Sequence, residues 1–208
     1  MVRGRLGLLA RVPVLLSLVA WGTSRCEAAA VQWSGNGHWY EAVYVGDHGI
    51  NWTAAQNAAA TKGGYLASIT SAAENDFVFS LVEEDKYWGD GATRGPWLGG
   101  YQTDATKLAD GWDWTGGEPW AYTNWAGGEP NDSPILSDRL QFMGYLGWRV
   151  GSWNDVCDDL TSAGGIDNPY GYVIESIPEP ATLILLTMGA VALLAYVWQK
   201  RGQAARAA

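Results

Sequence analysis

Cysteine is scarce in this chain, which has only Cys26 and Cys157 among its 208 residues. Cys26 lies in an N-terminal segment that we expect to be removed, so Cys157 would have no partner. A framework of disulfide bonds is therefore excluded. The fold must rely on buried side chains instead. The 13 tryptophans, 11 of them between positions 31 and 177, can supply much of the buried area.

Basic residues are also few. The segment from Val31 to Ile177 holds 20 of the 22 acidic residues but only six of the 13 lysines and arginines, a net charge of about −14. This balance excludes nucleic acid as a partner, because its phosphates require lysine and arginine. It suits divalent cations bound through oxygen. The two histidines, His38 and His48, are too few and too isolated to predict a zinc site or an acid–base pair.

Long hydrophobic runs occur only near the two ends. At the N-terminus, Arg3, Arg5 and Arg11 accompany the apolar run VPVLLSLVAW, and the alanines at 28–30 follow it. This order predicts a secretory signal peptide over residues 1–30. An uncleaved N-terminal anchor is the alternative, which the shortness of the apolar run disfavours.

The C-terminal run is longer and carries no charge from position 181 to position 198. With a rise of about 1.5 Å per residue, a helix of this length would cover roughly 27 Å, enough for the hydrocarbon core of a membrane. Lys200, Arg201 and Arg206 follow, which places this end in the cytoplasm and the rest of the chain outside. We therefore predict a transmembrane helix over residues 181–198. A buried core helix is the weaker alternative.

Pro178-Glu179-Pro180, the apolar run and the short basic tail together resemble the PEP-CTERM sorting signal of exported bacterial proteins, over residues 178–208. The resemblance implies an exosortase-type processing enzyme as a partner, and bacteria that make exopolysaccharide. The protein would be exported and inserted in the membrane by its C-terminal helix. After processing it would lie at the cell surface or in the extracellular matrix.

Between the two ends, the patterns predict a strand, two helices and then a loop-rich series of strands. We expect Asn51 to cap a helix from Trp52 to Lys62, and Ser71 with Glu74 to form the capping box of a second helix. Aromatic and β-branched stretches predict strands at HWYEAVYV, YLASI, PWLGG, RLQFM, GWRV, SWND and YGYVI. This order is typical of an α+β domain.

These elements, followed by GWDWTGGEPWAYTNWAGGEPND, WNDVC and VIE, resemble the C-type lectin-like domain over residues 31–177. The resemblance implies two helices, small antiparallel sheets and a long loop region. The two disulfides of the family are absent, because Arg139 and Ile174 stand where cysteines are expected. The packing of buried side chains must therefore provide the stability that these disulfides give in the family.

The resemblance also implies a calcium site. Glu129 and Asn131, on either side of Pro130, would form one half, and the Glu129–Pro130 peptide bond would be cis as in the family. Asn154 and Asp155 would form the other half. Calcium takes six to eight oxygen ligands, so neighbouring hydroxyls of one sugar ring could complete the shell. The order Glu-Pro-Asn goes with mannose-type sugars in the family.

Three further positions bear on this site. The carboxylate that the family usually has eight residues after its first glutamate is replaced by Ser137, a poor substitute for a charged oxygen. Asp138, the next residue, could turn into the gap as another metal ligand. Trp120 lies beside the loop and is a candidate for stacking on a sugar face, with packing in the core as the alternative.

These observations predict an exported, calcium-dependent carbohydrate-binding lectin. Ser137 favours the alternative, a calcium-independent module on the same fold that holds protein or matrix partners. We do not expect an enzyme. Acidic pairs such as Asp110 and Asp113 have no separation that the sequence defines, and the chain has no nucleophile elbow or phosphate-binding loop.

Overall fold

The structure is a computed structural model that describes residues 29–46, 48–89, 94–132, 137–145, 147–161, 167–178, 185 and 188–199. The predicted signal peptide lies almost wholly outside these residues, and so does part of the predicted span 181–198. The elements of the domain, in chain order, are β1 (Val31–Gln32), β2 (Trp39–Tyr44), α1 (Trp52–Thr61), β3 (Tyr65–Leu66), α2 (Ala72–Ser80), η1 (Asp85–Tyr87), β4 (Trp97–Gln102), β5 (Trp112–Trp114), β6 (Arg139–Tyr145), β7 (Trp148–Val156) and β8 (Gly171–Ser176).

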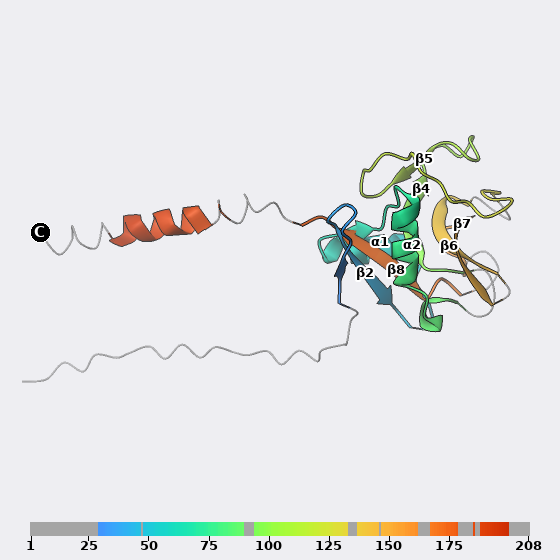
Figure 1. Cartoon of the computed structure of the whole chain (residues 1–208), viewed down its shortest axis with the longest axis horizontal. Coiled ribbons are helices and arrows are strands. Elements are labelled where there is room, and N and C mark those ends of the chain that lie inside the picture. Colours follow the sequence, from blue (N-terminus) through green and yellow to red (C-terminus); the bar gives the residue numbers. More distant parts are fainter. Residues whose placement is uncertain are drawn as a thin grey trace, which may run out of the picture.

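The strands of the described residues join into one sheet in the order β1-β2-β8-β4-β6-β7, with β3 added to β8 and β5 added to β4. In Figure 1, β2 and β8 lie together on one side, and β6 and β7 lie on the other. Most pairs are antiparallel, but β4 and β8 pair in parallel at Trp97 and Tyr172. That contact connects what the sequence predicted as separate small sheets. The α+β class is confirmed.

The two helices begin where the sequence predicts. Asn51 accepts a hydrogen bond from the Ala54 N–H through Oδ1 at 2.8 Å, and α1 ends before Gly63, whose φ of +78° suits glycine. Ser71 accepts from the Glu74 N–H through Oγ at 3.2 Å. Both N-terminal caps are therefore confirmed.

The other half of the predicted capping box differs. Glu74 does not reach back to the Ser71 N–H. Its Oε2 accepts from the N–H and the hydroxyl of Thr70, each at 2.7 Å. Its Oε1 accepts from the Tyr40 hydroxyl at 2.5 Å and from Asn36 Nδ2 at 3.0 Å, which pulls the carboxylate into the interior. Glu74 is only 1% exposed. Tertiary partners outweigh the local cap here.

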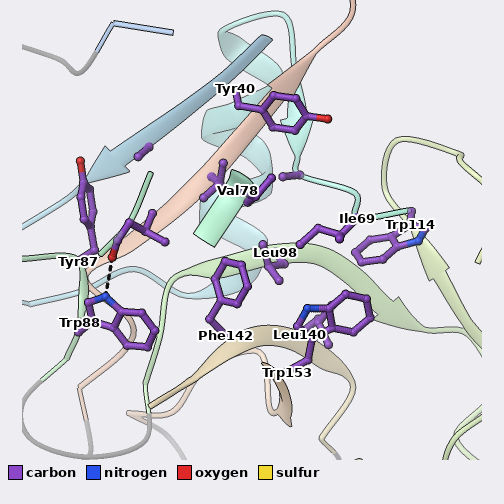
Figure 2. Close-up of a cluster of buried hydrophobic side chains, with 14 of the residues drawn as sticks. Tyr40, Ile69, Val78, Tyr87, Trp88, Leu98, Trp114, Leu140, Phe142 and Trp153 are labelled. Atoms are coloured by element: carbon purple, nitrogen blue, oxygen red, sulfur yellow. Dashed lines mark hydrogen bonds between the residues drawn. The ribbon is translucent and has the colours of Figure 1, made fainter. Parts of the chain in front are cut away.

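The main core lies between α2 and the central strands. Figure 2 shows Val78 of α2, Leu98 of β4 and Phe142 of β6 close together, with Trp114 and Trp153 beside them. All five are buried. Fully burying an apolar side chain of this kind contributes about 1.5–3 kcal/mol. The tryptophans thus supply the stability expected from a domain without disulfides.

A second core cluster covers the positions where the family has cysteines. Ile174 is buried among Trp52, Leu66 and Trp97. The Arg139 guanidinium lies over the Trp52 ring, with Cζ 4.7 Å from the ring centre, a cation–π contact. Cys157 forms no disulfide within the part of the chain that is described. Apolar and cation–π packing therefore occupies these positions.

Candidate functional site

A long loop between β5 and β6 runs beside β7 and is tied to it by backbone hydrogen bonds. The Trp153 N–H donates to the Asn124 carbonyl at 2.8 Å, and the Ala126 N–H donates to the Trp153 carbonyl at 2.9 Å. Asn124 Nδ2 also donates to the Gly151 carbonyl at 2.8 Å. A turn follows, in which the Glu129 N–H donates to the Ala126 carbonyl. These hydrogen bonds place residues 129–132 beside the end of β7.

The loop then meets Asp155. The peptide bond between Glu129 and Pro130 is cis. Asp155 accepts from the Asn131 N–H through Oδ1 at 3.0 Å and from the Asp132 N–H through Oδ2 at 2.8 Å. Two segments that are far apart in sequence therefore meet through a carboxylate that is 2% exposed. Each Asp155 oxygen accepts one backbone hydrogen, so each retains lone-pair capacity for another partner.

The Glu129 carboxylate is the electrostatically unusual group of this site. Its Oε2 is buried and has no hydrogen-bond partner among the residues that the structure describes. Burial, followed by the neighbouring Asp155 carboxylate, raises the pKa of Glu129 to about 7. An unpaired carboxylate oxygen next to a second carboxylate is costly unless a proton or a cation joins them. The arrangement can therefore bind either one.

The two asparagines of the predicted site contribute differently. Asn131 is anchored by its backbone N–H on Asp155. Asn154 precedes Asp155 on β7, is 9% exposed and lies opposite Gln141 of β6 in the ladder. The structure therefore brings Glu129, Asn131 and Asp155 to one place, with Asn154 adjacent on the strand.

Asp132 is a residue of this site that the sequence reasoning missed. Its Oδ1 accepts from the Ser137 N–H at 2.8 Å, while its own N–H donates to Asp155. Ser137 is 2% exposed, so this contact holds the Asp132 carboxylate against the backbone of the residue that stands where the family usually has a carboxylate of its own. The signal was an acidic residue directly after Asn131, and the departure at Ser137 should have directed attention to it.

Asp138 does not join the group. Its Oδ2 lies 3.0 Å from Arg139 Nη1, and its backbone carbonyl accepts from the Gln102 N–H. Burial raises the pKa of Asp138, although the Arg139 charge opposes this. The pairing with Arg139 holds the carboxylate, so the turn toward Ser137 that the sequence suggested is not seen.

Trp120 is partly buried against the main core. Its ring centre lies 4.5 Å from that of Trp114 and 5.8 Å from that of Trp153. It also stacks on Trp112, with 5.8 Å between ring centres and an interplanar angle of 23°. Much of the Trp120 indole is therefore packed against other tryptophans. Stacking of its exposed part on a sugar ring stays a prediction.

A family model decides the classification. The lectin C-type domain matches residues 48–162, and the PEP-CTERM protein-sorting motif matches residues 176–201. The chain belongs to the C-type lectin domain family. Both resemblances found in the sequence are confirmed.

Relatives and solved structures agree with this family. The chain is 36% identical over 101 residues to a type-2 ice-structuring protein of Brachyopsis segaliensis, covering 49% of this chain and 51% of that protein. It is 34% identical over 107 residues to ladderlectin of Oncorhynchus mykiss, covering 51% and 50%. The chain thus spans about half the length of these curated relatives, which are lectin and ice-structuring proteins rather than enzymes.

Among solved structures, the cow C-type carbohydrate-recognition domain of CD23, determined in the presence of a GlcNAc2Man3 oligosaccharide, matches with a TM-score of 0.52. The match covers 75% of this chain and 98% of that chain at 23% identity. At this identity the likeness shows the C-type lectin-like fold alone.

The C-terminal tail contains a helix at residues 188–199 whose large apolar side chains are exposed. Within the described residues, no helix combines the length and the hydropathy that a membrane crossing requires. Several residues of the predicted span 181–198 lie outside that part of the chain. The transmembrane helix therefore stays a prediction.

Proposed function

We propose that this domain binds carbohydrate through a calcium ion held by Glu129, Asn131, Asn154 and Asp155. The observation that carries the proposal is the buried Oε2 of Glu129, which lies beside Asp155 and has no hydrogen-bond partner within the described part of the chain. Calcium prefers carboxylate, amide and carbonyl oxygens, and these side chains offer that donor set. A bound cation would also offset the repulsion between the two carboxylates.

The sugar would be of mannose type. The bound ion supplies a positive centre toward which two neighbouring hydroxyls of one ring can turn their oxygens. The Glu129 carboxylate would accept a hydrogen from one hydroxyl, and the Asn131 side-chain amide would donate to its oxygen. Asn154 and Asp155 would do the same for the second hydroxyl. Trp120 would contact the ring from the exposed part of its indole.

The sorting motif supports a place of action outside the cell. A protein of this kind would be exported by a bacterium, processed by an exosortase-type enzyme at the tail and retained at the surface or in the matrix. Exopolysaccharide is then the natural ligand class. The C-terminal helix would hold the chain in the membrane before processing.

A calcium-independent interaction module is the second candidate. Two observations favour it: Ser137 stands where the family usually has a carboxylate, and both Asp155 oxygens already accept backbone hydrogens. One of the relatives with a similar sequence is an ice-structuring protein, whose name refers to ice and not to a sugar ligand.

Calorimetric titration of the purified protein separates the two candidates. Calcium should bind the wild-type protein, and mannose should bind only after calcium and be released by a chelator. The Glu129→Gln variant should lose both events, whereas Asp110→Asn, which removes a charge from an exposed loop position, should retain both. Mannose binding that survives the chelator would contradict the calcium mechanism.

A further inference from the structure

A second cluster of ligand-type side chains shares no residue with the site above. His38 precedes β2, Glu118 follows β5, and Glu175 lies in β8. One donor atom from each, a ring nitrogen or a carboxylate oxygen, lies within 4.8 Å of the others. His38 is isolated in the sequence but not in the fold, because the last strand and the long loop meet beside it.

The three side chains are held in place by their surroundings. His38 Nδ1 lies 2.5 Å from Glu175 Oε1, and the Ser68 N–H donates to Glu175 Oε2 at 2.9 Å. Glu118 accepts from the Tyr65 hydroxyl at 2.8 Å and from the Ser68 hydroxyl at 2.7 Å, one on each oxygen. These contacts fix both carboxylates before any ion arrives.

Gly116 contributes to this arrangement. A Cβ at position 116 would collide with Glu118 Oε2 and with the Tyr65 ring. The absence of a side chain there allows the loop to turn Glu118 in toward Ser68 and Glu175. Glycine is required at this position by close approach and not by its backbone angle.

Little positive charge faces the carboxylates of the cluster. The Tyr40 hydroxyl lies 3.0 Å from Glu175 Oε1 and 2.5 Å from Glu74 Oε1, so a third carboxylate joins the network. Glu74 and Glu175 are each 1% exposed. Among their partners in the described residues, none is a lysine or an arginine, and His38 is the one group that can carry positive charge. Burial, with a contribution from Glu118, raises the pKa of Glu175 to about 7 against the hydrogen bonds that lower it.

We propose that His38, Glu118 and Glu175 bind a zinc-type divalent cation that ties the long loop to the sheet. An imidazole nitrogen with two carboxylate oxygens is a donor set that suits zinc better than calcium, which prefers oxygen alone. Zinc bonds of about 2.0–2.2 Å place tetrahedral ligand atoms roughly 3.4 Å apart, so the His38–Glu175 contact would open by about 1 Å. Water would take the fourth position. The His38 side chain is 20% exposed, which provides a path from solvent.

The consequence is structural. The ion would join the turn before β2, the final strand β8 and the loop that begins at Glu118 and continues to Glu129. Without an ion, the loop is attached by the Tyr65 and Ser68 hydrogen bonds to Glu118 and by backbone bonds near Asn124 and Ala126. A zinc clamp at Glu118 would strengthen the first of these attachments in a domain that lacks the disulfides of its family.

Titration of the full chain with zinc chloride, and separately with cobalt(II) as a coloured probe, tests the site. We expect one ion per chain from this cluster and a cobalt spectrum typical of tetrahedral coordination. His38→Gln should weaken zinc binding at least about tenfold, since even the loss of a group that only hydrogen-bonds a metal ligand costs roughly 10–100-fold. His48→Gln, which alters an exposed histidine, is the matched control and should bind as the wild type does.

Further variants keep the outcome decisive. If His38→Gln loses the near-ultraviolet circular dichroism of the tryptophans, Glu118→Gln replaces it, because that residue lies in a loop. Glu129→Gln should bind zinc normally while losing calcium, so the two sites fail independently. Zinc affinity that ignores both His38→Gln and Glu118→Gln would overturn the proposal. So would a cobalt spectrum that millimolar calcium abolishes.

Discussion

The two carboxylate clusters of this domain contrast in how their charges are satisfied. Glu175 accepts hydrogen bonds from Ser68, Tyr40 and His38, whereas one buried oxygen of Glu129 has no partner in the described ranges. The pKa of each carboxyl is raised to about 7, mainly by burial. The same raised pKa therefore accompanies a fully bonded group in one place and an open one in the other. Hydrogen-bond satisfaction, rather than the pKa, therefore distinguishes a carboxylate that already supports the metal-free fold from one whose buried oxygen is still open to a proton or a cation.

The largest expected effect comes from breaking the satisfied cluster. Glu175→Ala should lower the free energy of unfolding by about 3 kcal/mol or more, because it leaves the buried Ser68 N–H and Tyr40 hydroxyl with fewer acceptors. Urea unfolding followed by tryptophan fluorescence measures this. Glu175→Gln, which keeps an acceptor, should cost less. Equal losses in the two variants would contradict the hydrogen-bond explanation.

Breaking the open cluster should have the opposite effect on the metal-free protein. Glu129→Gln removes the repulsion between Glu129 and Asp155, so at pH 8 and without calcium the variant should be at least as stable as the wild type. Its melting temperature should not rise on addition of calcium, whereas that of the wild type should. Thermal melts with calcium or with chelator test both statements. A clear loss of metal-free stability would show that Glu129 has partners that stabilise the fold.

The contrast also predicts a pH dependence. The pKa of Glu129 is raised from 4.5 to about 7 on folding, so its contribution to stability is present below pH 4.5 and is lost as the pH rises through about 7. Protons and calcium compete for the same oxygens, so calcium affinity should increase over that range. Unfolding and calcium titrations at pH 5, 6, 7 and 8 measure the two trends. Glu129→Gln should remove the contribution of Glu129 to the change of stability with pH. The contribution of Glu175 should remain.

The smallest effect is expected from restoring the carboxylate of the family. Ser137→Glu should strengthen calcium binding by about tenfold, or roughly 1.4 kcal/mol, because a charged oxygen replaces a hydroxyl. The same change should lower metal-free stability, since position 137 is buried and Asp132 already lies against its backbone. Calorimetric titration measures the calcium affinity, and thermal melts in the presence of a chelator measure the metal-free stability. An unchanged calcium affinity would favour the calcium-independent candidate.

Much of the fold followed from local signals. Asn51 and Ser71 cap the helices as predicted, and Gly63 ends the first one, because caps and stops act within one turn of chain. The Glu129–Pro130 bond is cis, as the resemblance implied. The capping-box role of Glu74 was wrong in its second half, since buried hydroxyl and amide partners from Tyr40 and Asn36 attract its carboxylate.

The candidate sites followed from the sequence only in part. Glu129, Asn131 and Asp155 were named because a family pattern relates segments that no local rule connects. Asp132 was missed because its role depends on the Ser137 backbone, and Asp138 was misplaced because the adjacent Arg139 pairs with it. Such choices between neighbouring partners depend on which face each side chain occupies after packing.

By itself, the sequence determined the family, the starts of the two helices, the acidic character of the domain and the sorting motif at its end. These properties depend on composition, on short-range backbone chemistry or on motifs of adjacent residues. Only the tertiary structure decided that His38, Glu118 and Glu175 meet, and that one buried oxygen of Glu129 has no partner among the described residues. Both outcomes arise when distant strands and a long loop close on one another and exclude water, and no spacing within a single segment encodes that.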